Sequence, residues 1–99
     1  MINFELFAKF DWDEGNSDKN WLKHKVSIVE SEEVFSQRPV IILPDDKHFQ
    51  KTENRFHAFG KTSVNRLLII CFTIRNKNIR VISARPMNAR ERNFYENQK

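Results

Sequence analysis

The chain has 99 residues, of which 39% are hydrophobic, and we expect residues 1–99 to form one small domain with one core. Seventeen lysines and arginines against thirteen acidic residues give a net charge of +4, which permits nucleic-acid binding without requiring it. A single cysteine excludes a disulfide within the chain, no apolar run approaches the roughly 20 residues that span a bilayer, and no signal peptide is recognisable, so we expect a cytoplasmic protein.

The N-terminal part of the chain predicts one strand followed by two helices. Residues 4–12 alternate in the period of two that is typical of a strand with one buried face. Asp13 can cap a helix that runs to about His24. Ser27 and Glu30 have the spacing of a capping box, which predicts the start of a second helix.

The middle of the chain predicts three strands. Pro39 ends the second helix, because the residue before a proline disfavours the helical region. Short strands are predicted over residues 40–43, 55–60 and 66–74. Consecutive strands joined by short turns pair antiparallel.

The last part of the chain predicts a strand and a helix. A polar turn over residues 75–78 leads into a strand that begins at Ile79. Asn88 and Glu91 have capping-box spacing and open a C-terminal helix. The order of elements predicts an α+β fold, in which the two N-terminal helices and the C-terminal helix pack on one face of a twisted antiparallel sheet of four to five strands.

Seven arginines follow residue 54 and form the first candidate site. On neighbouring antiparallel strands, residues of matching parity share a face, so Arg55, Arg66 and Arg80 are predicted to converge. A phosphate would relieve the repulsion between them and accept bidentate hydrogen bonds. The alternative is that they are solvated at strand ends, which is the commoner state of arginine. The full set is Arg55, Arg66, Arg75, Arg80, Arg85, Arg90 and Arg92.

Metal binding has little support in the sequence. The three histidines are His24, His48 and His57, and their spacings match no compact ligand motif. Cys71 lies within an apolar run, and we interpret it as a buried, inert thiol. We therefore predict no metal site and no cofactor.

Two residues before the predicted strand over residues 55–60 are candidates for acid–base chemistry. His48 lies in a polar loop, where it is free to act as an acid or a base. Glu53 and Arg55 are two residues apart and so point to one face of a strand. They form either a surface ion pair or a general base beside a phosphate-binding arginine. No nucleophile-elbow or phosphate-loop pattern occurs.

Several short motifs follow one another along the chain. The most specific piece is Ile-Ser-Ala-Arg at residues 82–85, followed by Glu91-Arg92 and Tyr95. The other motifs are residues 10–13, 23–24, 26–27, 34–35, 66–67, 72–75 and 80–81, with His48, Glu53, Arg55 and Gly60 among them. In their order and spacing, these motifs resemble those of BrnT toxins over roughly residues 10–96.

This resemblance implies a RelE-like fold and an RNA endonuclease toxin of a bacterial type II toxin–antitoxin system. Such a toxin inhibits translation by cutting RNA without a metal ion. The resemblance also implies a BrnA-like antitoxin, a small DNA-binding protein that neutralises the toxin, so that the toxin meets DNA only through the complex that represses its operon. The alternative is a basic module that binds nucleic acid or the antitoxin without catalysis.

Under this resemblance we assign roles to individual residues. Arg66, Arg80 and Arg85 are predicted to bind the phosphate and stabilise the charge of the transition state. Glu53 or His48 is the candidate base, and Lys23 or His24 adds positive charge or acts as the acid. The wider RNA-binding set is His24, Arg55, Arg75 and Arg90.

Two positions depart from the family pattern. Lys25 stands where the family usually has glycine, so the lysine must adopt a left-handed backbone or the helix must end differently. Pro86 stands where the family often has a basic residue, which removes one charge from the expected RNA-binding surface.

Overall fold

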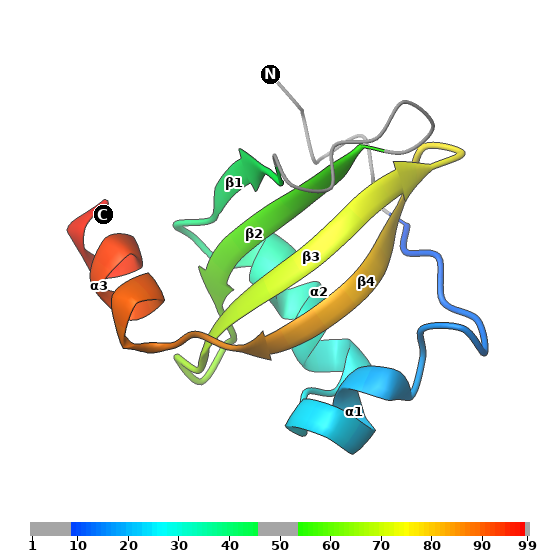
Figure 1. Ribbon diagram of the computed structural model, residues 1–99, viewed down its shortest axis with the longest axis horizontal. Coiled ribbons are helices and arrows are strands. Elements are labelled where there is room, and N and C mark those ends of the chain that lie inside the picture. Colours follow the sequence, from blue (N-terminus) through cyan, green and yellow to red (C-terminus); the bar gives the residue numbers. More distant parts are fainter. Residues whose placement is uncertain (1–8, 46–53, 99) are drawn as a thin grey trace.

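The computed structural model describes residues 9–45 and 54–98, which form three helices and one four-stranded sheet (Figure 1). The strands pair antiparallel in the order β1-β2-β3-β4. The elements are α1 (Lys19–His24), α2 (Ile28–Ser36), β1 (Ile41–Pro44), β2 (Arg55–Lys61), β3 (Leu67–Arg75), β4 (Asn78–Pro86) and α3 (Ala89–Asn97). This arrangement confirms the predicted α+β fold.

One face of the sheet, which we call the inner face, is covered by α1 and α2. Figure 1 shows α2 running behind the strands. Alternate residues of β3 point to this side, and Leu68, Ile70 and Phe72 are fully buried there. Phe35 of α2 meets Phe72 edge to face, with ring centroids 5.1 Å apart. The main core therefore lies between α2 and the sheet.

Gly60 lets α2 approach β2 closely. A Cβ atom at this position would lie 2.8 Å from Cγ1 of Val34 and 3.2 Å from the Val34 carbonyl oxygen. A carbon–carbon contact of 2.8 Å is not tolerated, so a side chain at Gly60 would force Val34 and α2 to shift away from β2.

The opposite face, which we call the outer face, carries α3 at one end. Phe59 and Ile69 pack there against Met87 and Tyr95. Tyr95 is fully buried, and its hydroxyl donates a hydrogen bond of 2.6 Å to the Pro39 carbonyl. The expectation that all helices share one face is wrong for α3, because the sheet also presents apolar side chains on its outer face at this end.

The strand predictions agree with the structure to within about one residue at most ends. The predicted strands over residues 40–43, 55–60 and 66–74 correspond to β1, β2 and β3. Most of the predicted first strand, residues 4–12, lies outside the described residues. Phe10 forms an isolated parallel bridge with Ile79, so this part of the segment runs beside β4.

The first helix is shorter than predicted, because α1 begins at Lys19 and not near Asp13. Asp13 instead closes a turn, in which its Oδ1 accepts a 2.8 Å hydrogen bond from the Gly15 N–H. Asn16 is buried, and its side-chain amide donates to the carbonyls of Asp11 and Val81, each at 3.0 Å. These contacts hold residues 13–17 against β4 in a non-helical conformation.

Both predicted capping boxes are present. Ser27 and Glu30 exchange two hydrogen bonds of 3.0 Å at the start of α2, and Asn88 and Glu91 exchange two of 2.8 Å at the start of α3. Lys25 has φ 57° and ψ 41°, so the lysine adopts the left-handed conformation that ends α1. The departure from glycine at this position is thus accommodated by the backbone.

Candidate functional site

Strands β2, β3 and β4 align chemically distinct side chains in three rows across the outer face. Neighbouring rows are two residues, or about 7 Å, apart along each strand. From β2 to β4 the rows are Arg55, Thr73 and Arg80, then His57, Cys71 and Ser83, then Phe59, Ile69 and Arg85. A histidine row is therefore flanked on both sides by rows that contain arginine.

A bulge in β4 decides which of its arginines share this face. Cys71 pairs with Ser83 but the next residue, Phe72, pairs with Val81, so Ile82 is an extra residue in the strand. An extra residue reverses the alternation of the side chains that follow it. Arg80 and Arg85 consequently lie on the same face, although simple alternation along the sequence places them on opposite faces.

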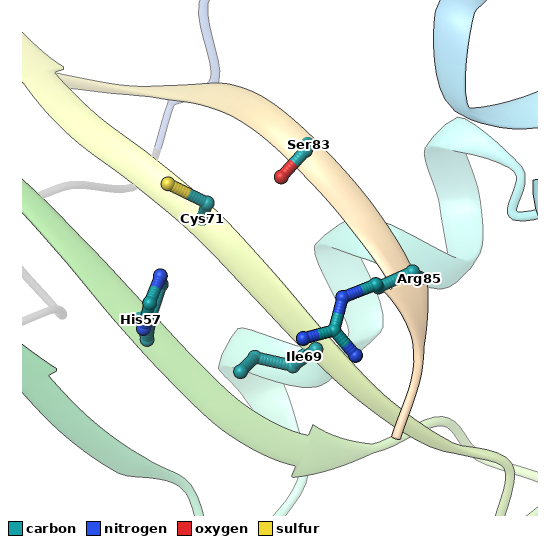
Figure 2. A pocket seen from close by; sticks show the side chains of 5 residues that line it. All are labelled: His57, Ile69, Cys71, Ser83 and Arg85. Carbon is teal, nitrogen blue, oxygen red and sulfur yellow. The ribbon is translucent and has the colours of Figure 1, made fainter. Parts of the chain in front are cut away.

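A small pocket occupies the centre of the outer face (Figure 2). His57 of β2, Cys71 of β3 and Ser83 of β4 line it along one row. Figure 2 shows the Arg85 side chain extending from β4 across the sheet beside Ile69. The pocket thus combines an imidazole, a thiol, a hydroxyl and a guanidinium.

Glu91 fixes the guanidinium of Arg85. Nη1 and Nη2 donate to the two Glu91 carboxylate oxygens, each at 2.7 Å, and Nη1 also donates to the Pro86 carbonyl at 3.2 Å. The hydrogen bond from Arg85 lowers the pKa of Glu91, although partial burial opposes this, and the same hydrogen bond raises the pKa of Arg85. These contacts use three of the five N–H donors of the guanidinium, and the side chain remains 40% exposed.

A buried carboxylate contacts His57. Nε2 of His57 lies 3.3 Å from Oδ2 of Asp45, whose side chain is only 9% exposed. The backbone N–H of Asp45 donates to the Arg55 carbonyl at 2.8 Å, which holds Asp45 beside the start of β2. A carboxylate on one imidazole nitrogen orients the ring and leaves the other nitrogen to exchange a proton.

Arg80 lies on the outer face, but two acidic residues bind its guanidinium. Nη1 and Nη2 donate to the Asp13 carboxylate, each at 3.0 Å, and Asp11 lies 3.5 Å from Nη1. The hydrogen bond from Arg80 lowers the pKa of Asp13. Arg55 lies in the same row, with Thr73 between them. The predicted gathering of Arg55 and Arg80 on one face is therefore confirmed.

The predicted convergence is wrong for Arg66. The register pairs Arg55 with Thr73, so the odd-numbered residues of β3 share the outer face with Arg55. Arg66 comes just before β3 and two positions before Leu68, so its side chain points to the inner side as that of Leu68 does. Its Nη1 donates to Glu30 at 2.9 Å and to the Lys25 carbonyl at 2.8 Å. Arg66 therefore lies among the ends of α1 and α2 and away from the other two arginines.

The remaining predicted residues are distributed over the molecule. Lys23 and His24 form the last turn of α1, where the His24 carbonyl accepts a 3.4 Å hydrogen bond from Arg66. Arg75 is exposed at the end of β3, and Arg90 is exposed on α3. His48 and Glu53 lie outside the described residues.

Sequence reasoning missed several residues around the pocket. His57 was considered only as a metal ligand, and Asp45, Ser83 and Glu91 had no assigned role in chemistry. Alternation along residues 55–60 places His57 on the face of the strand opposite to the one that carries Phe56 and Ala58. This alternation could have indicated that the His57 side chain is not covered by the main core.

The interpretation of Cys71 as a buried, inert thiol is only partly correct. Burial raises the pKa of the thiol and Asp45 raises it further, yet the side chain is only half-buried and lines the pocket. The apolar run around Cys71 suggested complete burial because β3 buries side chains on both of its faces. Ile69 faces α3 and Ile70 faces α2.

Comparison with known protein families yields a match over most of the chain. A family model described as the ribonuclease toxin BrnT of a type II toxin–antitoxin system matches residues 12–91, which is more than half of the chain. The matched region includes every residue that lines the pocket. No curated protein matches the sequence. No helix in the described part of the chain is long and apolar enough to cross a membrane.

Proposed function

Because the chain belongs to the BrnT family of ribonuclease toxins of type II toxin–antitoxin systems, we propose that it cleaves RNA in the pocket on its outer face. A cognate antitoxin and an RNA substrate follow from membership of this family. The observation that carries the proposed site is the position of Arg85 and His57 in one pocket, each oriented by a carboxylate.

The proposed reaction needs no metal ion. The 2′-oxygen of a ribose attacks the neighbouring phosphorus and the bond from phosphorus to the 5′-oxygen breaks, which leaves a 2′,3′-cyclic phosphate and a 5′-hydroxyl. A base takes the proton of the 2′-hydroxyl and an acid supplies a proton to the departing 5′-oxygen. Cationic donors stabilise the charge that develops on the phosphate oxygens.

Arg85 is suited to the phosphate because, among the described residues, its contacts with Glu91 and Pro86 use only three of its five N–H donors. Glu91 holds the guanidinium in place before RNA arrives, which reduces the cost of ordering it. His57 is suited to proton transfer, because Asp45 orients its ring beside the same pocket.

The sequence-based assignments complete the proposal. Glu53 or His48 remains a candidate base, and Lys23 or His24 a candidate acid or source of charge. Arg66 and Arg80 remain candidate phosphate ligands, although both are bound to carboxylates. Arg55, Arg75 and Arg90 are proposed to attract the RNA backbone.

We further propose a BrnA-like antitoxin that binds DNA, so that the toxin reaches its operon only within the complex. The proposed site of action is the cytoplasm, where RNA is translated. The proposed substrate class is single-stranded RNA, because a shallow open pocket admits a splayed-out backbone more readily than a stiff duplex.

The test incubates purified protein with RNA in EDTA and analyses the ends of the products. We expect a 2′,3′-cyclic phosphate, and a rate roughly 10²–10⁴-fold lower for His57→Gln. Arg38→Ala, a change at an exposed arginine beyond the end of α2, is the control and should leave the rate unchanged. The proposed site is wrong if folded His57→Gln cleaves RNA at the parental rate. Intact RNA with salt-dependent binding would instead support a binding module.

A further inference from the structure

Three side chains of different chemistry meet beside the pocket. A carboxylate oxygen of Asp45, an imidazole nitrogen of His57 and the Sγ atom of Cys71 all lie within 4.8 Å of one another. They come from three separate places, namely the residue after β1, the middle of β2 and the middle of β3. Sequence spacing did not reveal this group, because the sheet alone brings the three residues together.

The donor set suits a zinc ion. Zinc binds cysteine sulfur at about 2.3 Å, histidine nitrogen at about 2.0–2.1 Å and carboxylate oxygen at about 2.0–2.2 Å. Donor atoms around one tetrahedral zinc therefore lie roughly 3.2–3.8 Å apart. His57 and Asp45 already have this separation, at 3.3 Å. Because all three donor atoms lie within 4.8 Å of one another, the sulfur needs to approach the other two by at most about one ångström.

The backbone around the three ligands is well anchored. His57 and Cys71 are direct partners in the antiparallel pairing of β2 with β3. Asp45 is tied to β2 by its backbone hydrogen bond to Arg55. A group of ligands held by paired strands loses little freedom when an ion binds.

The negative charges of two of the ligands would balance the charge of a divalent ion. Arg55 and Lys19 are near enough to influence Cys71 electrostatically, and both would repel a bare cation. Zinc binding releases the thiol proton to solvent as the sulfur–zinc bond forms. The resulting thiolate and the Asp45 carboxylate together neutralise the two charges of the ion.

We propose that Asp45, His57 and Cys71 bind Zn²⁺ and that the bound ion inhibits RNA cleavage. The inhibition rests on the proposed function, because zinc on Nε2 of His57 would keep the proton on Nδ1, so that this nitrogen could no longer take up a proton during cleavage. The ion would also place a fourth ligand, water or phosphate, in the pocket. The protein is then a ribonuclease that works without a metal and is switched off by one.

The binding test uses Co²⁺ as a spectroscopic substitute for zinc in the full chain. The parental protein should develop the near-ultraviolet charge-transfer band of a cobalt–thiolate bond, and added Zn²⁺ should remove it. Cys71→Ser should lack the band, whereas His24→Gln, which changes a histidine in α1, should retain it. A band that persists in folded Cys71→Ser overturns the proposal.

Asp45→Asn supplies a second test that does not depend on the thiol. This variant keeps the cysteine and should bind Co²⁺ at least roughly tenfold more weakly than the parental protein. Equal affinity would exclude Asp45 as a ligand. Circular dichroism of each variant establishes that it is folded.

The cleavage test adds Zn²⁺ alone to the parental protein. We expect the rate to fall at least roughly tenfold and to recover fully when EDTA is added. Cys71→Ser should cleave RNA in EDTA and resist zinc. Zinc that binds without slowing cleavage overturns the inhibition. Absence of cleavage in EDTA would contradict the proposed function and leave the cobalt result to decide the metal site.

Discussion

Two arginines of this chain are held by the same local device on opposite faces of the sheet. On the inner side, Arg66 binds Glu30, and on the outer face Arg85 binds Glu91. Each glutamate is also the third residue of a helix and closes a capping box, so one carboxylate serves a helix end and an arginine together.

The surroundings of the two pairs differ. Arg66 also donates to the carbonyls of His24 and Lys25, and so joins the end of α1 to α2 and the start of β3. Within residues 9–45 and 54–98, Arg85 has one further acceptor, the Pro86 carbonyl, and it borders the pocket. A capping glutamate can therefore position an arginine either to secure the fold or to face a ligand. The neighbouring groups decide which of these two roles the arginine has.

The largest expected effect is on cleavage by Arg85→Ala. The rate per folded molecule should fall roughly 10²–10³-fold, because a donor to the developing phosphate charge is lost. The free energy of unfolding should fall by less than about 1 kcal/mol, since the pair is partly exposed. Initial rates and urea unfolding measure the two effects, with Arg38→Ala as the control. An unchanged rate would remove Arg85 from the site.

Arg66→Ala should act mainly on stability. Glu30 and two backbone carbonyls each lose one donor, so the free energy of unfolding should fall by about 1–2 kcal/mol. Urea unfolding measures this loss. The sequence also assigned Arg66 to the phosphate. A cleavage rate that falls as far as that of Arg85→Ala would support that assignment and break the contrast between the faces.

The two capping boxes allow a matched pair of changes. Ser27→Ala and Asn88→Ala should each lower the free energy of unfolding by about 1 kcal/mol, because each removes one side-chain acceptor from a helix end. Only Asn88→Ala should also slow cleavage, by a few-fold, because it loosens Glu91, the residue that orients Arg85. Equal rates for the two variants would show that the cap of α3 does not support the site.

The smallest effect is the pH dependence of stability. Hydrogen bonding to Arg85 lowers the pKa of Glu91 below its ordinary value of 4.5. Burial would raise the pKa of Glu30, but hydrogen bonds from Ser27 and Arg66 outweigh it and lower the pKa.

A carboxyl group whose folded pKa is lowered adds stability that is fully present above its unfolded pKa and is lost as the pH falls through the folded pKa. Stability should therefore decline below about pH 4.5, by less than about 1 kcal/mol for each glutamate. Chemical unfolding at several pH values should show a flatter profile for Glu30→Gln and Glu91→Gln. An unchanged profile in both would exclude these pairs as its cause.

Local patterns were enough to predict much of the fold. Alternation gave β2 and β3, and the spacing of Ser27 with Glu30 and of Asn88 with Glu91 gave the starts of α2 and α3. The start of α1 was predicted wrongly, because Asp13 binds Arg80, which is distant in sequence.

The candidate site was predictable only in part. Arg85 was identified through the motif that it shares with BrnT toxins. The pairing of His57 with Asp45 and the position of Cys71 were not, because the three residues belong to different strands and turns. The bulge at Ile82 was also missed, and it alone places Arg85 on the same face as Arg80.

The sequence by itself determined the elements and their order, since capping and alternation depend on residues close together in the chain. It also determined the family, through motifs read in order. The tertiary structure decided which groups meet, because strand register and one extra residue set the face to which each side chain points. Local sequence thus gave Arg66 and Arg85 the same kind of partner, a glutamate that caps a helix. Packing on opposite faces of one sheet gave the two arginines different surroundings.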